Sequence, residues 1–432
     1  MAQTYKFGNG TWATKKGSTL AYNDENNNYK PLPFTTTRNS IATRVNKEGL
    51  IEVVGNDVPR IDYTDSADGA LLLEPSRTNL FQYSEDFGNS YWTNSGSSES
   101  SGFISPDGTN NAFKLIENID TVEHYIKKSI ANPIGFYTWS LFVKAEERKY
   151  IVFRTNADGG AYKNSCFDIE SGTIVYDGLH QSKAEIQPLN NGWFRVSAYV
   201  KETSGTTRNY HIHISDSPVT DNGSISYQGN GISGVYIYGA MLELSAYPTS
   251  YIPTNGSTVT RLADTASGSG NSEVFNDSEG VLFADISALT DIATSERVVI
   301  SDGISSSNRV VIEYDETFGL VKFWVTGSGT TNGEVQISGV NKTQINKISM
   351  LYKTNVLKIF INGFNVGNGT GIIVPTGLDN LKFEQAIGGN NFYGKTKQLQ
   401  YYDSALTDSE LETLTSWTSF SEMANAQQYK TY

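Results

Sequence analysis

Apolar and polar residues alternate over short runs in the last third of the chain, which predicts antiparallel strands with one buried and one exposed face. Residues 347–352 have the length of one strand, and residues 357–366 contain two more, which meet at Asn362 and Gly363. Asn-Gly is favoured where a tight hairpin needs positive φ at both central residues. A further strand is predicted at residues 397–402.

The middle of the chain repeats this pattern. Apolar or alternating runs of strand length occur at residues 137–143, 150–154, 193–200 and 235–244. Asn-Gly pairs at Gly192 and Gly223 predict turns between the runs. Pro248 and Pro253 then end the predicted sheet. The polar run at 265–272 has the composition of a flexible linker, and another β-rich segment begins near Gly280.

Residues 1 to about 88 are polar and rich in turns, and their apolar residues are too scattered for a compact core. We expect short extended pieces that wrap on other chains. Short apolar runs such as residues 71–73 would be buried by intertwined copies, which predicts a homotrimer formed through this region.

The ordered motifs of the C-terminal part resemble the laminin G-like, or concanavalin A-like, jelly roll. They are the strand ending at Tyr352, the Asn-Gly hairpin, the run 386–394 with Gly388-Gly389, the strand at 397–402, and a capping box. The capping box, Thr407 followed by Glu410, predicts a short helix. This resemblance covers about 280 to 417 and implies a lectin-like module.

Two further resemblances concern the rest of the chain. Residues 89 to 262, closing with the run 243–254, resemble the carbohydrate-binding jelly roll of phage structural proteins. The leader at residues 34–52, 58–63 and 71–80 is similar to the segment that precedes such modules in bacteriophage tail fibres and related appendages. The resemblance implies an appendage protein on the head or tail of a virion.

Together these patterns predict an all-β fold with two antiparallel jelly-roll β-sandwiches in tandem after an extended N-terminal attachment region. The expected domains are 1–88 for virion attachment and oligomerisation, 89–262 for a carbohydrate-binding-like sandwich, 263–418 for a laminin G-like sandwich, and 419–432 for a polar tail. Two or three domains also fit the length of 432 residues.

Composition narrows the function. The formal charge of -13 disfavours nucleic acid, because an acidic chain is repelled by phosphate. Cys166, the single cysteine, is expected to be a small buried core residue. No segment has the roughly 20 apolar residues needed to insert in a membrane, and the first residues lack the apolar core of a signal peptide. We therefore expect synthesis in a bacterial cytoplasm and release as part of a virion.

One pair of carboxylates, Glu313 and Asp315, is a candidate for catalysis. Glu313 and Asp315 fall on the same strand face, about 6 to 7 Å apart by strand geometry, a separation that suits glycosidic hydrolysis. Related jelly-roll glycosidases carry a further Glu two or three positions later, where this chain has Thr317 and Phe318. The sequence therefore predicts no catalytic residue and a solvated strand face instead.

A pair of histidines, His211 and His213, also shares one strand face, but no third ligand at suitable spacing accompanies it, so a polar strand face is favoured over a zinc site. Laminin G-like modules often hold calcium between loops. No Asp/Asn cluster here matches a specific calcium loop, so no metal or other cofactor is predicted and calcium is left open.

Sugar recognition needs flat aromatic faces for the apolar side of a pyranose and amides or carboxylates for its hydroxyls. The loop residues that offer these groups are Tyr91 and Trp92 in the first sandwich and Asn390, Asn391 and Tyr393 in the second. The structural alternatives are that Tyr91 and Trp92 seal a domain junction and that Phe392 or Tyr393 caps the core.

These observations favour a non-enzymatic phage appendage protein whose partners are a host cell-surface glycan and other virion proteins. A glycan-cleaving depolymerase is the first alternative, disfavoured by the missing third acid and by the lack of a long repetitive β-helix. A bacterial surface adhesin is the second, and it lacks recognisable secretion and anchoring signals in this sequence.

Overall fold

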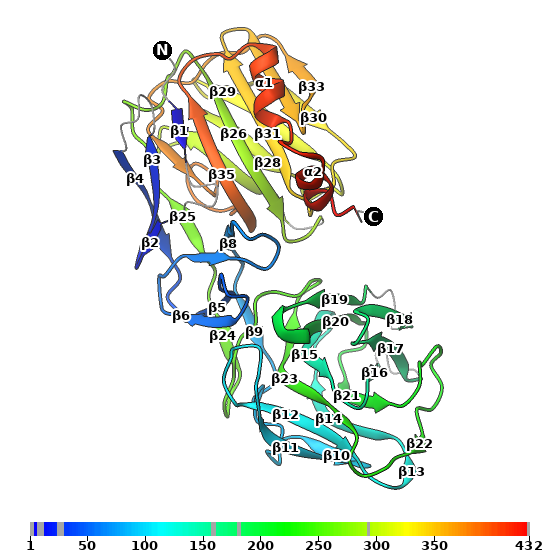
Figure 1. The fold of residues 1–432 in the computed structure, drawn as a ribbon. Coiled ribbons are helices and arrows are strands. Elements are labelled where there is room, and N and C mark those ends of the chain that lie inside the picture. The colour runs from blue at the N-terminus through cyan, green and yellow to red at the C-terminus, as the bar shows by residue number, and fades with distance from the viewer. Residues whose placement is uncertain are drawn as a thin grey trace. The chain divides into compact units, whose positions relative to one another are not determined.

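The computed structural model describes residues 4–6, 13–23, 30–156, 161–178, 183–291 and 294–429. In these residues the fold is all-β, as predicted, and helical structure is limited to α1 (Asp408–Thr415), α2 (Phe420–Ala426) and a 3-10 turn at Asn190–Gly192. None of the described helices is long and apolar enough to cross a membrane. The strands form several antiparallel sheets (Figure 1).

The chain forms two compact units that do not follow one another simply along the sequence. Unit 1 comprises Met1–Ile41, Val54–Pro75 and Ala263–Tyr432, and unit 2 comprises Ala42–Val53 and Ser76–Leu262. We expected residues 1–88 to form a separate region, but they are distributed between both units. The physical reason is that their short strands complete sheets within the same chain.

Unit 2 is built from two six-stranded sheets. The first has the order β10 (Thr93–Ser95), β14 (His124–Ala131), β21 (Thr207–Ser215), β16 (Tyr150–Thr155), β17 (Lys163–Asp168) and β18 (Thr173–Asp177). The second has the order β11 (Ser97–Phe103), β12 (Ala112–Glu117), β23 (Gly234–Leu244), β15 (Gly135–Ala145), β20 (Trp193–Glu202) and β19 (Glu185–Pro188). Two-stranded pairs join β13 (Thr121–Val122) to β22 (Tyr227–Gln228) and β9 (Arg77–Asn79) to β24 (Val259–Arg261).

Alternate residues of these strands fill the core of unit 2. Tyr137, Trp139, Leu141 and Val143 of β15 all belong to one buried cluster. Trp139 stacks on Phe153 with 4.0 Å between ring centres. Because side chains alternate across a strand, the intervening residues of β15 face the other side of the sheet.

Unit 1 contains a twelve-stranded sheet and a five-stranded sheet. The main path of the larger sheet is β25 (Thr265–Ser267), β4 (Lys30–Thr37), β3 (Ser18–Asn23), β1 (Thr4–Lys6), β35 (Gly394–Tyr402), β26 (Glu279–Ala288), β31 (Asn346–Lys353), β32 (Val356–Ile361) and β33 (Phe364–Gly369). The smaller sheet has the order β30 (Thr330–Ile337), β29 (Val321–Gly327), β28 (Arg309–Tyr314), β27 (Glu296–Ser301) and β34 (Asn380–Lys382).

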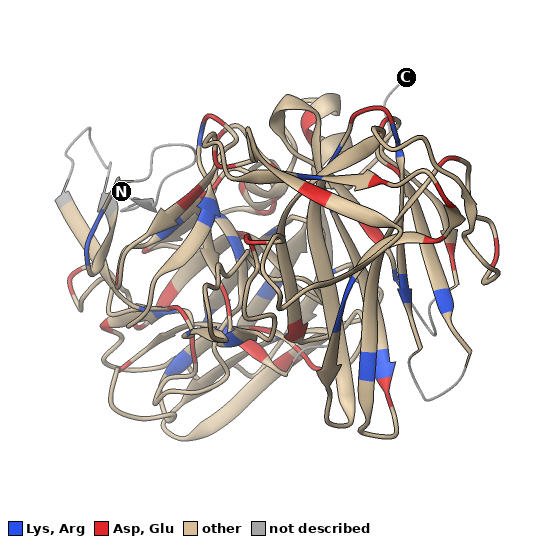
Figure 2. Cartoon of the chain, turned by 90° about the horizontal axis from the view of Figure 1, so that it is seen from below, with Lys and Arg blue, Asp and Glu red and all other residues tan. Residues whose placement is uncertain are grey.

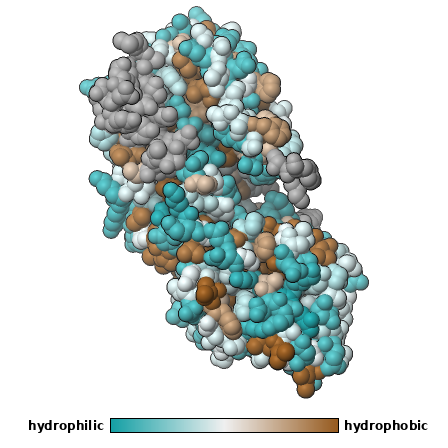
Figure 3. All heavy atoms as spheres, viewed as in Figure 1, coloured by the Kyte–Doolittle hydropathy of each residue, from teal (hydrophilic) through white to brown (hydrophobic). Residues whose placement is uncertain are grey.

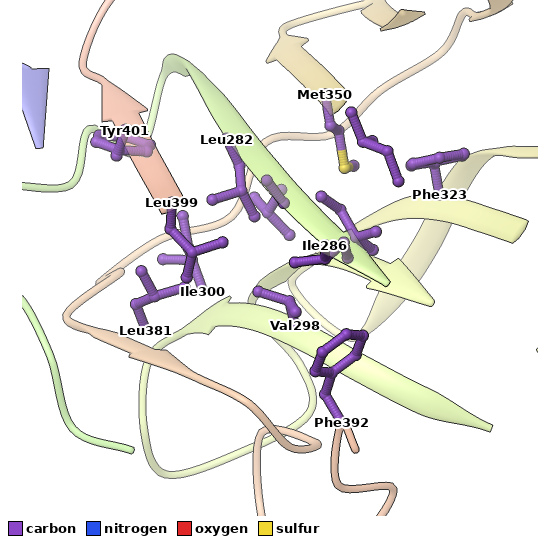
Figure 4. Packing of buried hydrophobic residues seen from close by; sticks show 14 of the residues in the cluster. Leu282, Ile286, Val298, Ile300, Phe323, Met350, Leu381, Phe392, Leu399 and Tyr401 are labelled. Carbon is purple, nitrogen blue, oxygen red and sulfur yellow. The ribbon is translucent and has the colours of Figure 1, made fainter. Parts of the chain in front are cut away.

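The core of unit 1 is formed by inward-facing side chains of both sheets, with Leu282, Ile286 and Met350 from the larger sheet and Val298 and Phe323 from the smaller one (Figure 4). Since successive residues of a strand face opposite sides, the residues between these core positions point away from the core. The outward side of the five-stranded sheet is the surface considered below.

The locally encoded elements are found where the sequence predicts them. Asn362 and Gly363 have φ of 51° and 89° between β32 and β33, as a primed hairpin turn requires. Thr407 caps α1 with both bonds of a capping box to Glu410. Leu411 of α1 is buried with Val281 and other residues on the outer side of the larger sheet.

The N-terminal segments supply several strands. β2 (Ala13–Lys15) pairs with β3, β5 (Ala42–Val45) with β6 (Ile51–Val54), and β7 (Arg60–Asp62) with β8 (Ala70–Leu73). β8 also pairs with β35, and β4 pairs with β25. These pairings place most strands of the leader in unit 1 of its own chain, whereas β5 and β6 belong mainly to unit 2.

A buried ion network fixes this arrangement in unit 1. Arg60 is fully buried, and its guanidinium bonds Glu74 at 2.6 Å and also Asp264. Arg38 bonds the other oxygen of Asp264 at 2.9 Å. Removing one partner of such a buried network leaves an uncompensated charge, which costs about 3–5 kcal/mol. These ion pairs therefore connect the leader to the segment at Ala263, where the C-terminal part of unit 1 begins.

Candidate functional site: the outer face of the five-stranded sheet

Charged, amide and aromatic side chains gather on the outer face of the five-stranded sheet of unit 1. On β28, Val310 and Ile312 are buried in the core, so Arg309, Val311 and Glu313 face outward. The register places further outward residues opposite them: Arg297 and Val299 on β27, and Lys322, Trp324 and Thr326 on β29. Residues directly opposite in an antiparallel pair share a face.

Trp324 lies at the centre of this face. Its side chain forms a small apolar cluster with Val299, Val311 and Ala386, and the residue is 7% exposed. Two guanidiniums flank the indole: the Arg297 carbon Cζ lies 5.2 Å from the ring centre and that of Arg309 lies 5.7 Å away. Such cation–π contacts contribute about 0.5–2 kcal/mol each and hold the arginines over the sheet.

Arg297 connects this face to a loop far away in the sequence. Its Nε donates to Glu313, and its Nη1 donates to Gln385 Oε1 at 2.7 Å. Its backbone N–H donates to the carbonyl of Asn390 at 3.0 Å. A parallel bridge also joins Arg297 to Asn391. The loop that the sequence singled out is thus anchored to the edge of the outer face.

The loop residues differ in their surroundings. Phe392 is 1% exposed and packs in the core against Tyr314 and Phe383, as the structural alternative proposed. Tyr393 is half-buried, and its hydroxyl accepts a hydrogen bond from Asn391 Nδ2 at 3.2 Å. Asn390 has a φ of 50° and is partly exposed. Asn390, Asn391 and Tyr393 therefore remain accessible to a ligand.

The carboxylate pair is not the solvated strand face that we expected. Glu313 and Asp315 are 3% and 5% exposed, because each carboxylate is covered by its ion-pair partner. Arg297 pairs with Glu313, and Lys322 pairs with Asp315. Burial raises the pKa of Glu313 although Arg297 opposes the rise, whereas hydrogen bonds from Lys322 and Thr317 outweigh burial and lower the pKa of Asp315. Both carboxylates are therefore engaged in ion pairs within the sheet.

Near one end of the sheet, a buried ammonium lies among oxygen atoms. Lys342 is 2% exposed, and its Nζ donates to the carbonyls of Asp315 at 2.5 Å and Thr317 at 3.0 Å. It also lies 3.2 Å from Asp291 Oδ1. Carbonyl and carboxylate oxygens are the ligands that calcium prefers, and here they surround a tethered cation. No group of three or more metal-binding side chains occurs among the described residues.

In unit 2, Trp92 does not offer the exposed stacking face that we expected. It is 5% exposed, packs against Phe81 and Phe87, and donates its indole N–H to the Tyr83 carbonyl at 2.9 Å. Tyr91 is half-buried, and the Lys128 ammonium lies 3.7 Å from its ring centre. The large apolar surface of Trp92 packs in the core of unit 2, which leaves it little free face for a sugar.

His211 and His213 share a face of β21, as predicted, but that face is covered. His211 is 5% exposed and His213 is fully buried. Neither ring has a hydrogen-bond partner among the described residues. Tyr125 lies 4.7 Å from both rings, and Tyr162 lies 5.3 Å from His211. The pair is packed between aromatic rings rather than arranged around a metal.

Sequence reasoning missed Arg297, Arg309 and the outward position of Trp324. The signal that could have found them is the period of two in β28, which places Arg309 and Glu313 on the same face, on either side of the apolar run 310–312. What no local pattern encodes is that Gln385 and the loop after it lie beside Arg297, since that contact joins residues 88 positions apart.

Charge and hydropathy describe the surface around these sites. Basic and acidic residues are interspersed along the strands (Figure 2). On the face seen in Figure 3, apolar residues occur singly or in small groups among hydrophilic ones. The exposed large apolar residues include Ile304, Phe318 and Ile387 on separate loops of unit 1.

No family model matches the chain, and no curated protein matches it. Among solved structures, the CBM40 module of an IT-sialidase from Ruminococcus gnavus is similar to part of the chain, with a TM-score of 0.29, 16% identity, and coverage of 34% of this chain and 93% of that one. Domain 4 of AbnA, a GH43 extracellular arabinanase from Geobacillus stearothermophilus, has a TM-score of 0.29 and 14% identity and covers 38% and 80%.

Mouse laminin alpha1 domains LG4-5 match with a TM-score of 0.25 and 11% identity, over 68% of this chain and 94% of that one. The strand order of the chain itself shows an all-β architecture of antiparallel sheets. Because all these similarities are low, the fold is assigned from the strand order of the chain itself. What the similar structures bind is a property of those proteins.

Proposed function

We propose that this protein is a structural component of a bacteriophage appendage, on the head or the tail, and that it binds a glycan of the host surface. The observation that carries the binding proposal is the outer face of the five-stranded sheet. There, Arg297 holds Gln385 and the loop that carries Asn390, Asn391 and the partly exposed ring of Tyr393. Hydrogen-bonding groups fixed on rigid strands next to an aromatic ring are what sugar recognition requires.

A glycan-binding experiment on the full chain tests this proposal. Arg297→Ala should weaken binding about tenfold or more, because it removes a charged donor and releases the loop. Arg44→Ala is the matched control, since Arg44 pairs with the exposed Glu52 in unit 2 and lies outside this face. Wild-type protein that binds no host-surface glycan on an array or on whole cells would contradict the proposal.

The place of the protein on a virion is the second half of the proposal, and the leader's similarity to appendage proteins motivates it. Imaging of phage particles with an antibody against residues 280–417 should label a head or tail structure. Particles that carry no label, while the antibody recognises the purified chain, would contradict a virion role.

We further propose that the assembly is a homotrimer formed through the N-terminal segments. Apolar side chains there are exposed in the single chain: Leu20 is 36% exposed, Ile41 45% and Val53 57%. Light scattering on the full chain should report three copies, and Ile41→Glu with Val53→Glu should report one. Ile304→Glu, at an 85% exposed loop residue, is the control and should stay trimeric.

The carboxylates of this face favour a binding role without catalysis. Glu313 and Asp315 are each held in an ion pair, and the third acid of related glycosidases is replaced by Thr317 and Phe318. Release of reducing sugar ends from host capsule by the wild type, lost in both Glu313→Gln and Asp315→Asn, would establish a depolymerase instead.

A further inference from the structure

A row of polar residues crosses the outer face of the five-stranded sheet beside Trp324. The register places Asn380 opposite Ser301, Ser301 opposite Arg309, and Arg309 opposite Thr326. The neighbouring residues along each strand, Leu381, Ile300, Val310 and Val325, are buried in the core, so all four polar side chains project outward.

This row contains polar atoms with unused hydrogen-bonding capacity. Arg309 Nη1 and Asn380 Oδ1 are buried and have no hydrogen-bond partner among the described residues. The same holds for Ser306 Oγ in the loop between β27 and β28. An unsatisfied buried donor or acceptor costs about as much as a lost hydrogen bond, so such atoms are normally paired. An unpaired donor on Arg309 and an unpaired acceptor on Asn380 in the same row, with an unpaired hydroxyl on the adjoining loop, indicate a ligand that supplies both kinds of group.

Charge distinguishes Arg309 from the other cations of this face. Arg297 is paired with Glu313, and Lys322 is paired with Asp315. Arg309 donates through Nε to Thr326 Oγ1 at 3.3 Å and forms no ion pair with any residue that the structure describes. Its guanidinium, held over Trp324, is therefore a positive group on this face that lacks a neutralising carboxylate.

The other end of the row is acidic. Gly303 lies close to this end of the row. A Cβ added at Gly303 would lie 3.1 Å from Asp379 Oδ1 and 3.6 Å from the Asn380 side chain. Beside it, Asp302 accepts hydrogen bonds from Ile304, Ser305 and Asn308. An anionic group is therefore favoured at the Arg309 end and neutral hydroxyls at the Asn380 end.

We propose that this row binds an acidic saccharide, with its anionic group on Arg309 and its hydroxyls on Asn380 and Ser306. This inference rests on the proposed function and specifies the class of glycan. The anion is a carboxylate or a sulfate, since both accept hydrogen bonds from a guanidinium. The chain carries a charge of -13, so the selectivity comes from this local pattern and not from the net charge.

Calorimetry on the full chain with three probes tests the inference: a uronate oligosaccharide, the same oligosaccharide after carboxyl reduction, and a sulfated neutral oligosaccharide. An acidic probe should bind at least about tenfold more tightly than the reduced probe. Added salt should reduce this difference in affinity. The sulfated probe identifies which anion is preferred. Equal affinity for all three probes overturns the inference and leaves the proposed function standing, whereas no binding to any glycan overturns both.

Variants locate the effect. Arg309→Gln should lose the preference for the acidic probe, because it weakens binding of that probe much more than binding of the reduced probe. Asn380→Asp keeps the shape and adds a negative charge, so it should weaken the acidic probe more than the reduced probe. Arg44→Gln in unit 2 is the control, and melting temperatures establish that each variant folds. A folded Arg309→Gln protein that retains the full preference overturns the inference.

Discussion

The imidazole rings of His211 and His213 lie parallel, with 5° between their planes and 5.4 Å between their centres. Both rings are buried in unit 2 without hydrogen-bond partners among the described residues. Burial, with Lys127 and Arg154, lowers the pKa of His211 to about 3. Burial, with His211, Arg154 and His124, lowers the pKa of His213 well below its usual value. The folded state therefore requires both rings to be neutral.

Acid should destabilise unit 2 through this pair. Because the folded-state pKa values are depressed, the neutral rings stabilise fully above the unfolded pKa of about 6.5, and this contribution falls as pH drops toward 3. Each histidine contributes up to about 1.4 kcal/mol per pH unit. Melting temperatures at pH 7.5 and 5.0 should differ less in His211→Gln with His213→Gln than in the wild type. An unchanged pH dependence in the double variant would contradict the assignment.

Glu313→Gln should lower stability by about 1–3 kcal/mol, because it leaves the Arg297 guanidinium without its carboxylate at a nearly buried position. Urea denaturation measures the change. Glu52→Gln is the comparison, since the pair of Arg44 with Glu52 is exposed and its loss should cost about 0.5 kcal/mol or less. Equal small effects in the two variants would mean that the Glu313 ion pair is solvated after all.

The loop at Asn391 and Tyr393 should contribute to glycan binding. Joint replacement by alanine removes an amide and an aromatic face while Phe392 keeps its place in the core. Whole-cell or glycan-array binding should fall at an unchanged melting temperature. A fall in melting temperature with unchanged binding of the remaining folded protein would assign the loop to the core.

Calcium removal should leave the wild-type melting temperature unchanged, because the Lys342 ammonium already occupies the oxygen cage formed by Asp315, Thr317 and Asp291. Lys342→Met should be destabilised by about 3–5 kcal/mol, since Asp291 loses its buried partner. Thermal melts with EDTA and with added calcium compare the two proteins. A wild-type melting temperature that falls in EDTA would reveal a calcium site elsewhere.

The all-β fold could be predicted because its signals are local. Alternation in the strands, the turn at Asn362 and Gly363, and the cap at Thr407 each depend on a few neighbouring residues. The burial of Trp92 depends instead on Phe81 and Phe87 folding back around it, and the pairing of Arg297 with Gln385 joins distant segments. Neither follows from spacing, and for that reason the candidate site was only partly found.

The structure of the leader also depends on contacts with residues far away in the sequence. Its short strands look incomplete in isolation, which suggested partners in other chains. The ion pair of Arg60 with Asp264 and the pairing of β8 with β35 show that these partners lie in the same chain, far away in the sequence. This finding leaves the trimer as a separate proposal that no longer depends on an unfolded leader.

The pairing of β8 with β35 also sets an order of events during synthesis. Asp65 beside β8 and Lys395 on β35 form an ion pair across 330 positions, while unit 2 consists mostly of the segment between them. On the ribosome, unit 2 emerges and can fold before the strands that complete unit 1 exist. Within the leader, β7 and β8 can pair with each other, but β1 and β8 lack their partner β35 until the end of the chain is made. Truncation before β35 should therefore leave these two strands without that partner while unit 2 stays intact.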